Sequence, residues 1–284
     1  MKRYKMTLSY FGKDFSGWQI QPTSLSVQQM LQEKLTLLLK EEIKVIGAGR
    51  TDSFVHALEQ TAHFDTSKKI NIDQIKCSLN GLLSSSIRIL SLEETDGSFH
   101  ARYSARGKTY RYLICNQEKY FPFLQDLCYL TRKKIDLEKL KKAALVFLGT
   151  HNFLSFSNKA SVGCAKNKPT KTIYRFEITQ KDPFYIIEIT GDGFLYKMVR
   201  NIVGALLSVN DNKLTIADVR NILLQKDRTR APAPADPLGL YLVKVHYFEE
   251  EVLKKKNDIS SLENLFAFSA CLSKQAEQAC CKEP

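Results

Sequence analysis

The apolar residues of this chain change their spacing repeatedly, and this change constrains the fold more than any other feature. Tyr4–Tyr10 alternates apolar and polar side chains, as a strand with one buried face does. Val27–Leu38 then carries an apolar stripe at helical spacing, after Ser26 and Gln29 in the arrangement of a capping box. A chain that interleaves the two periods in this way is predicted to fold as an α+β protein.

The same two patterns divide the chain into two halves and a tail. Each half mixes strands and helices as a split βαβ unit around a mostly antiparallel sheet does. We therefore expect an α+β half over residues 1–106, a second over 107–250, and a tail over 251–284 that is partly helical or disordered. Further strands are expected near 62–64, 87–92, 99–104, 110–114, 173–178, 185–189 and 241–247, and helices over 136–148, from about 196 to 207, and after Thr215 and Asp218.

Charge narrows the class of partner. Lys and Arg total 42 against 30 Asp and Glu, a formal net charge of +12, which suits nucleic acid or an anionic membrane surface. No apolar run approaches the length of a spanning helix, and the first residues lack the apolar core of a signal peptide. Seven scattered cysteines without a CxxC pair argue against a disulfide framework or a zinc site. We expect a cytoplasmic protein without a metal.

Gly47–Asp52, with the sequence Gly-Ala-Gly-Arg-Thr-Asp, is the first stretch that could carry chemistry. Its glycines permit a sharp turn or close approach to a ligand, and Arg50, Thr51 and Asp52 follow directly. Taken alone, the stretch favours a tight turn with a local ion pair between Arg50 and Asp52. Without a following phosphate-loop lysine, it does not indicate a nucleotide site.

Two later stretches also combine unusual residue types. On a strand at 109–114, Tyr110 and Tyr112 would share one face with Arg111 on the other, and aromatic rings interleaved with cations suit RNA. Tyrosines on a strand are also ordinary core residues. On the helix near 196–207, Arg200 and Gly204 lie off the apolar stripe, so Arg200 either faces solvent or reaches into a site. Gly204 indicates close approach by another segment.

Together these stretches closely resemble the tRNA pseudouridine synthase A family, and the match extends from about Tyr4 to Tyr247. The motifs that carry the resemblance occur in the family's order: Tyr10-Phe11-Gly12 with Phe15, Gly17-Trp18-Gln19, Gln21 and Val27-Gln28; Gly49-Arg50-Thr51-Asp52; Phe99 to Ala105 with Tyr110-Arg111-Tyr112; Phe194 to Arg200; and Ala231-Pro232-Ala233 with Gly239-Leu240.

The resemblance implies an isomerisation of uridine to pseudouridine in the anticodon stem-loop of tRNA, at positions 38–40, without metal or cofactor. It also implies two ferredoxin-like halves with the active cleft between them, and a homodimer that binds tRNA. Asp52 would be the catalytic nucleophile, Arg200 its ion-pair partner and Tyr110 a ring that stacks on the base. Arg50 would fill the place that the base leaves in the RNA.

Two residues depart from the family pattern. Phe54 stands where glycine is usual, and Lys197 where histidine is frequent. We expect ordinary φ and ψ values at Phe54, with its ring packed on apolar neighbours such as Val55 or Leu58. His56 also matches a family position, and we interpret it as structural, because a lone histidine is more often a hydrogen-bonded core residue than a catalyst.

Two other functions are compatible with these residues. One is an RNA-binding protein that keeps the fold and has lost the chemistry, which the presence of Asp52, Tyr110 and Arg200 together disfavours. The other is a metal-dependent nuclease that uses Asp52 and His56, which the lack of any other clustered carboxylate disfavours.

Overall fold

The structure is a computed structural model, and it describes residues 1–117, 122–158 and 168–253. Met1–Val252 forms one compact unit. The short helix α6 (Glu249–Leu253) ends the described chain, so the rest of the expected tail lies outside the described residues. None of the helices within these ranges is long and apolar enough to span a bilayer.

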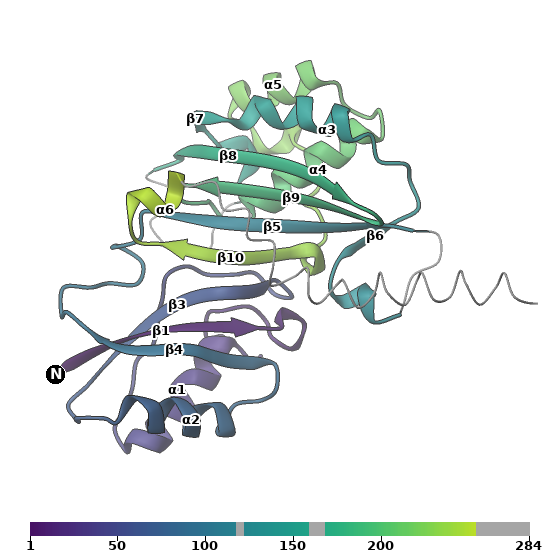
Figure 1. The fold of residues 1–284 in the computed structure, drawn as a ribbon. Helices are drawn as coiled ribbons and strands as arrows, with labels where there is room; N and C mark the ends of the chain where they lie inside the picture. The colour runs from purple at the N-terminus through teal and green to yellow at the C-terminus, as the bar shows by residue number, and fades with distance from the viewer. Residues whose placement is uncertain (118–121, 159–167, 254–284) are drawn as a thin grey trace, which may run out of the picture. The chain divides into compact units, whose positions relative to one another are not determined.

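A sheet that has ten strands within the described ranges runs through this unit (Figure 1). Eight strands follow the order β4-β1-β3-β10-β5-β9-β8-β7, while β2 pairs with β3 and β6 with β5. Neighbours are antiparallel except for β10 with β3 and β5 with β6. The α+β prediction with a mostly antiparallel sheet is therefore confirmed. The strands are β1 (Lys2–Tyr10), β2 (Ile46–Gly47), β3 (His56–Thr66), β4 (Ile87–Thr95), β5 (Gly107–Asn116), β6 (Tyr129–Thr131), β7 (Gly149–Asn152), β8 (Thr170–Lys181), β9 (Phe184–Gly191) and β10 (Leu240–His246).

Helices α1 (Val27–Leu39) and α2 (Ile72–Leu82) lie beside the N-terminal strands (Figure 1). The helix α1 begins as its sequence predicts, with Ser26 Oγ accepting a hydrogen bond from the Gln29 amide at 3.2 Å. The Gln29 side chain binds Glu33 instead of closing the capping box. The apolar stripe of α1 faces the core, with Leu31 and Leu35 buried and Met30 and Leu38 partly buried, and the alternate residues of β1 are buried, so both periods in the sequence correspond to core faces.

Helices α3 (Leu137–Ala144), α4 (Met198–Asn210) and α5 (Ile216–Gln225) lie with β7, β8 and β9 (Figure 1). Thr215 and Asp218 form a complete capping box at the start of α5. The apolar face of α4 is buried, as its spacing predicts. Gly204 faces the backbone of a later segment, because a Cβ there would lie 2.2 Å from the Ala233 oxygen.

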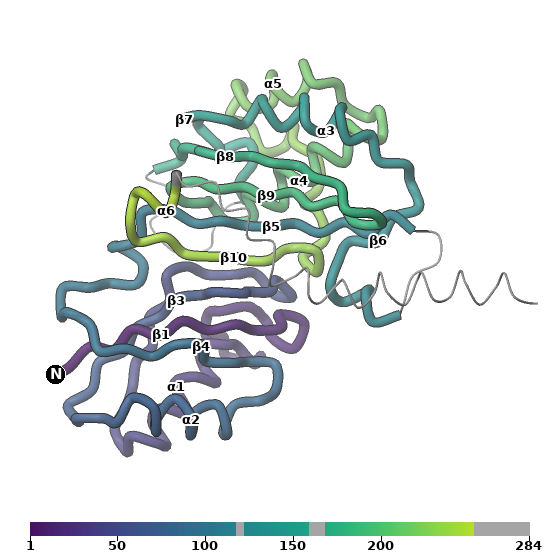
Figure 2. Tube along the Cα trace, in the orientation of Figure 1, coloured from purple at the N-terminus to yellow at the C-terminus, as the bar shows by residue number. Residues whose placement is uncertain are grey.

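Strand β10 joins the two halves of the sequence. It lies between β3 and β5 although it is the last of the described strands along the chain (Figure 2). Tyr241 and Leu242 pair in parallel with His56 and Ala57 of β3, while the other edge of β10 runs antiparallel to β5. This pairing brings the loop before β3, which contains Asp52, to the side of β5.

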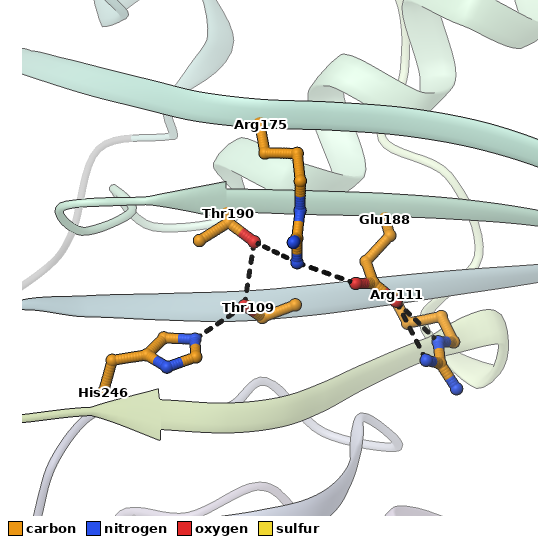
Figure 3. Close-up of polar contacts among 6 residues, drawn as sticks. All are labelled: Thr109, Arg111, Arg175, Glu188, Thr190 and His246. Carbon is orange, nitrogen blue, oxygen red and sulfur yellow. Dashed lines mark hydrogen bonds and ion pairs between the residues drawn. The ribbon is translucent and has the colours of Figure 1, made fainter. Parts of the chain in front are cut away.

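The two faces of β5 have different chemistry. On one face Arg111 pairs with Glu188 of β9 at 2.9 Å, and the Thr109 hydroxyl contacts both Thr190 Oγ1 and His246 Nε2 at 2.8 Å (Figure 3). The even-numbered residues of the strand point to the opposite face, because side chains alternate along a strand. Lys108 and Tyr110 on that face line the same pocket as Arg200 of α4.

The strand predicted at 99–104 is wrong. These residues form turns, in which the His100 ring nitrogen Nδ1 accepts from the amides of Arg102 and Tyr103 at 3.1 and 3.2 Å. Ser104 Oγ accepts from the His100 amide at 2.9 Å. Local hydrogen bonds from side chains thus replace the pairing of a strand.

Candidate active site

The loop at 48–55 connects β2 to β3 and presents Asp52. Its first residue is tied to β3 by a hydrogen bond of 2.7 Å from the Ala48 amide to the Thr61 oxygen. Gly17, at φ +87°, lets a second loop pass beneath, since a Cβ there would lie 2.6 Å from the Thr51 oxygen. That oxygen accepts from the Trp18 amide at 3.2 Å. The N-terminal loop therefore supports the loop that carries Asp52.

A buried polar cluster fixes the same loop from below. Tyr10 and Thr51 share a hydrogen bond of 2.8 Å between their hydroxyls, and the side-chain Nε2 of Gln60 donates to the Gly49 backbone oxygen at 3.0 Å. Burial raises the pKa of Tyr10 to about 12, so its hydroxyl keeps its proton at neutral pH. Because both contacts hold residues adjacent to Arg50 and Asp52, the direction of the loop is set by the core.

Asp52, in the loop before β3, forms an ion pair with Arg200 of α4. Arg200 Nη1 lies 3.0 Å from Asp52 Oδ2, and the two side chains are 12% and 17% exposed. The Arg200 Nε donates to the Ala235 oxygen at 2.8 Å, and the Ala235 amide returns a bond to the Arg200 oxygen at 2.9 Å. The guanidinium is thus positioned by a backbone oxygen as well as by the carboxylate. Asp52 is thus paired with Arg200 and not with Arg50, as it would be in a simple tight turn.

A pocket of about 370 Å³ opens over this pair. Tyr110 lies in its wall, with its ring edge-to-face with that of Phe194 at 5.1 Å between centroids and only 8% exposed. Arg50 is exposed at the rim. The structure therefore brings all four residues singled out in the sequence, Asp52, Tyr110, Arg50 and Arg200, to one pocket, which joins a carboxylate, a fixed cation and an aromatic wall.

The expectation for Phe54 is wrong. Its φ is +68°, in the left-handed region, and its ring is 45% exposed. The reason is the tight loop: the Phe54 amide points to the Phe15 oxygen at 3.4 Å, and the Val55 amide bonds back to the Asp52 oxygen at 3.2 Å. The loop imposes a conformation that favours glycine, and phenylalanine adopts it with its ring outside the core.

His56 is structural, as interpreted from the sequence. Its Nδ1 accepts from the Gly12 amide at 3.0 Å, and its Nε2 lies 3.1 Å from the Leu238 oxygen. The ring stacks between Phe11 and Tyr241, with centroid distances of 5.1 and 4.6 Å. Burial lowers the pKa of His56 to about 4. A neutral histidine in this position supports the loop through these hydrogen bonds and ring contacts. In the described part of the chain, no group of three or more His, Cys, Asp or Glu could hold a metal ion.

Comparison with known proteins identifies the family of the chain. A family model described as tRNA pseudouridine synthase matches residues 6–104 and 143–248. The chain belongs to the tRNA pseudouridine synthase family. The tRNA pseudouridine synthase A 1 of Protochlamydia amoebophila is 44% identical over 251 residues, which are 88% of this chain and 98% of that protein. The tRNA pseudouridine synthase A of Thermoanaerobacter pseudethanolicus is 40% identical over 87% of this chain and all of that protein. That of Limosilactobacillus reuteri (strain DSM 20016) is 40% identical over 87% of this chain and 97% of that protein.

Sequence reasoning gave no role to some residues of the pocket in this member of the tRNA pseudouridine synthase family. Phe194 was noted only as part of a motif, yet its ring supports Tyr110. Lys108 also lines the pocket, two residues before Tyr110 on β5. The period of two along a strand is the signal that could have found Lys108, because it places both side chains on the same face.

Proposed function

We propose that this protein converts uridine to pseudouridine in the anticodon stem-loop of tRNA, at positions 38–40, with Asp52 as the nucleophile and no cofactor. Membership of the family supports the reaction and the tRNA substrate. The observation that carries the site is the ion pair between Asp52 and Arg200 in a pocket lined by Tyr110. The pocket supplies the nucleophile and the positive charge beside it.

The reaction is an isomerisation, so it needs no oxidant, reductant or second substrate. The bond between N1 of uracil and C1′ of ribose breaks, a bond between C5 and C1′ forms, C5 loses its hydrogen, and N1 gains one. The proposed role of Asp52 needs an ionised carboxylate, whether it attacks the base, attacks the sugar or removes a sugar proton. Arg200 at 3.0 Å balances that charge inside the pocket.

The target base must leave its stack to enter the pocket, at a cost of a few kcal/mol. The proposed role of Tyr110 is to stack on the base, which returns roughly 1–3 kcal/mol. Its ring is held for this by Phe194 and by its place on β5. Arg50 is proposed to occupy the vacated place in the RNA, which its exposed position at the rim permits.

The wider proposals follow from the same family. The halves 1–106 and 107–250 are proposed to be ferredoxin-like, and the contribution of Asp52 by one and of Tyr110 and Arg200 by the other supports a cleft between them. The protein is proposed to be a cytoplasmic homodimer. An RNA-binding protein without activity remains the alternative, but a carboxylate and a guanidinium 3.0 Å apart under an aromatic wall favour catalysis.

The test uses tRNA whose uridines carry tritium at C5, which formation of pseudouridine releases. The purified protein should release tritium in excess EDTA, and mapping the product should place pseudouridine at positions 38–40. Binding without release would establish the inactive RNA-binding alternative. Activity that EDTA abolishes and added metal restores would contradict the cofactor-free reaction, and RNA cleavage that EDTA stops would indicate a nuclease.

A further inference from the structure

Lys108 lies in the pocket wall without a negative partner. Its Nζ donates to the Ala48 oxygen at 2.9 Å. Among the residues that the structure describes, no carboxylate pairs with Lys108. A lysine ammonium has three N–H donors, so this one contact leaves donors for a ligand. A half-buried cation whose only described partner is a neutral oxygen is a natural site for an anion.

The neighbouring residues leave room for this side chain. A Cβ at Gly49 would lie 2.6 Å from Lys108 Nζ, so a side chain at that position would displace the end of the lysine from its place against the catalytic loop. The stretch between Gly47 and Asp52 thus has a second property besides its turn: it accommodates a cation from β5.

Other positive charges gather at the same wall. Arg102 is exposed and lines the pocket with Lys108. Burial, and then the positive charges of Arg102 and Lys171, lower the pKa of Lys108 to about 8. The ammonium therefore remains protonated at neutral pH, and a bound anion would relieve the repulsion among the three cations.

We propose that Lys108, together with Arg102, binds a phosphodiester group of the RNA next to the uridine that enters the pocket. The inference rests on the proposed function, because RNA supplies the phosphate. The spacing of residues along β5 agrees with a phosphate site beside the uridine. Lys108 and Tyr110 are two residues apart on one face of β5, roughly 7 Å along the strand. This separation is comparable to that between a base and its own phosphate, so Tyr110 can stack on the base while Lys108 binds the backbone.

The first experiment measures binding of an anticodon-arm RNA over a range of salt concentrations. Lys108→Met removes the charge and keeps most of the stem, whereas Lys108→Arg keeps the charge. We expect Lys108→Met to weaken binding by roughly tenfold or more and to make the slope of log affinity against log salt shallower by about 0.7. Lys108→Arg should keep the wild-type slope. Lys142→Met, on the exposed face of α3, is the matched control and should change the affinity and the salt slope less than Lys108→Met does.

The second experiment identifies the phosphate. A set of the same RNA carries a single neutral methylphosphonate at each linkage around the target uridine. One linkage should weaken binding to the wild-type protein by a similar factor and have little further effect on Lys108→Met. If the methionine variant does not fold, Lys108→Gln replaces it, since the amide keeps a donor for the Ala48 oxygen without the charge.

The outcomes separate this inference from the proposed function. If wild-type protein releases no tritium from tRNA, the proposed function fails. If the wild type is active but Lys108→Met has the wild-type salt slope, or the neutral linkages act independently of Lys108, the phosphate site is wrong. A lower melting temperature of Lys108→Met with unchanged RNA binding would also contradict the phosphate site, because the only role of Lys108 would then be its hydrogen bond to the Ala48 oxygen.

Discussion

Phe54 shows how one residue can differ from the pattern around it. The loop that presents Asp52 holds Phe54 at φ +68°, and its amide and that of Val55 are both directed by neighbouring carbonyls. A residue with a Cβ is disfavoured in this region by about 1–2 kcal/mol. The exposed ring gives back little by burial.

Phe54→Gly should therefore leave the free energy of unfolding unchanged or raise it by up to about 1 kcal/mol, because relief of the left-handed conformation offsets the extra freedom of the unfolded chain. Urea unfolding measures this directly. Phe54→Ala is the matched control, since it removes the same ring and keeps the Cβ. A glycine variant less stable than the alanine variant would contradict the account of this loop.

The family motifs in the sequence single out Asp52, Tyr110, Arg50 and Arg200, and the structure places all four in one pocket, while their roles stay a prediction. It was not sufficient for Phe54, since a positive φ is set by contacts with a loop far away in sequence. Lys108 was overlooked for a related reason: a lysine on a strand is an ordinary residue until Gly49 and the Ala48 oxygen are placed beside it.

At the scale of elements, most helices and strands were predicted from their periodic pattern, whereas α2 and the turns at 99–104 were not. The caps at Ser26 and Thr215 and the stripe of α4 were correct because they depend on local spacing. The helix α2 was not predicted, although Ile72, Ile75 and Leu79 stand at helical spacing in the sequence and lie in or against the core. The sequence at 99–104 predicts a strand where turns form, because side-chain hydrogen bonds within a loop leave no periodic pattern.

Two buried histidines of β3 make the stability depend on pH. His56 Nδ1 and His63 Nδ1 accept hydrogen bonds from the amides of Gly12 and Ala101, at 3.0 and 3.1 Å. Burial lowers the pKa of each to about 4. In the unfolded chain these histidines are protonated near pH 6.5, whereas in the folded chain they are protonated only near pH 4. The stability that is fully present above about pH 6.5 is therefore lost as the pH falls toward 4.

Between about pH 7.5 and pH 5, His56 alone should reduce the free energy of unfolding by on the order of 2 kcal/mol. Urea unfolding at the two pH values measures the loss. In His56→Asn the amide oxygen can take the place of Nδ1 without titrating, so the variant should be less stable at the higher pH but lose less on acidification. An equal loss in both proteins would show that His56 is not responsible.

At the scale of the whole molecule, the placement of β10 could not be predicted. Its sequence indicates a strand, but nothing local specifies that it lies between β3 and β5. That placement joins the two halves and brings Asp52 to Arg200, which is 148 residues later in the chain. The resemblance to a family supplied the expectation of a shared site, and the sheet order explains how it forms.

The net charge of +12 leads to a prediction for the whole protein. Binding of tRNA should weaken steeply as salt increases, because neutralised phosphates release counterions. A plot of log affinity against log salt should have a slope several units below zero if the basic residues lie along the RNA path. A nearly flat plot would mean that these residues are dispersed over the surface.

The central claim is that Asp52 is the nucleophile of a uridine isomerase, and release of tritium from C5-labelled tRNA tests it most directly. Asp52→Asn keeps the size of the side chain and an oxygen for Arg200 but removes the charge, so tRNA binding should change little. We expect release by the wild-type protein and none above background by Asp52→Asn, at concentrations where both proteins are saturated with tRNA. Release by Asp52→Asn at more than a few per cent of the wild-type rate would contradict it.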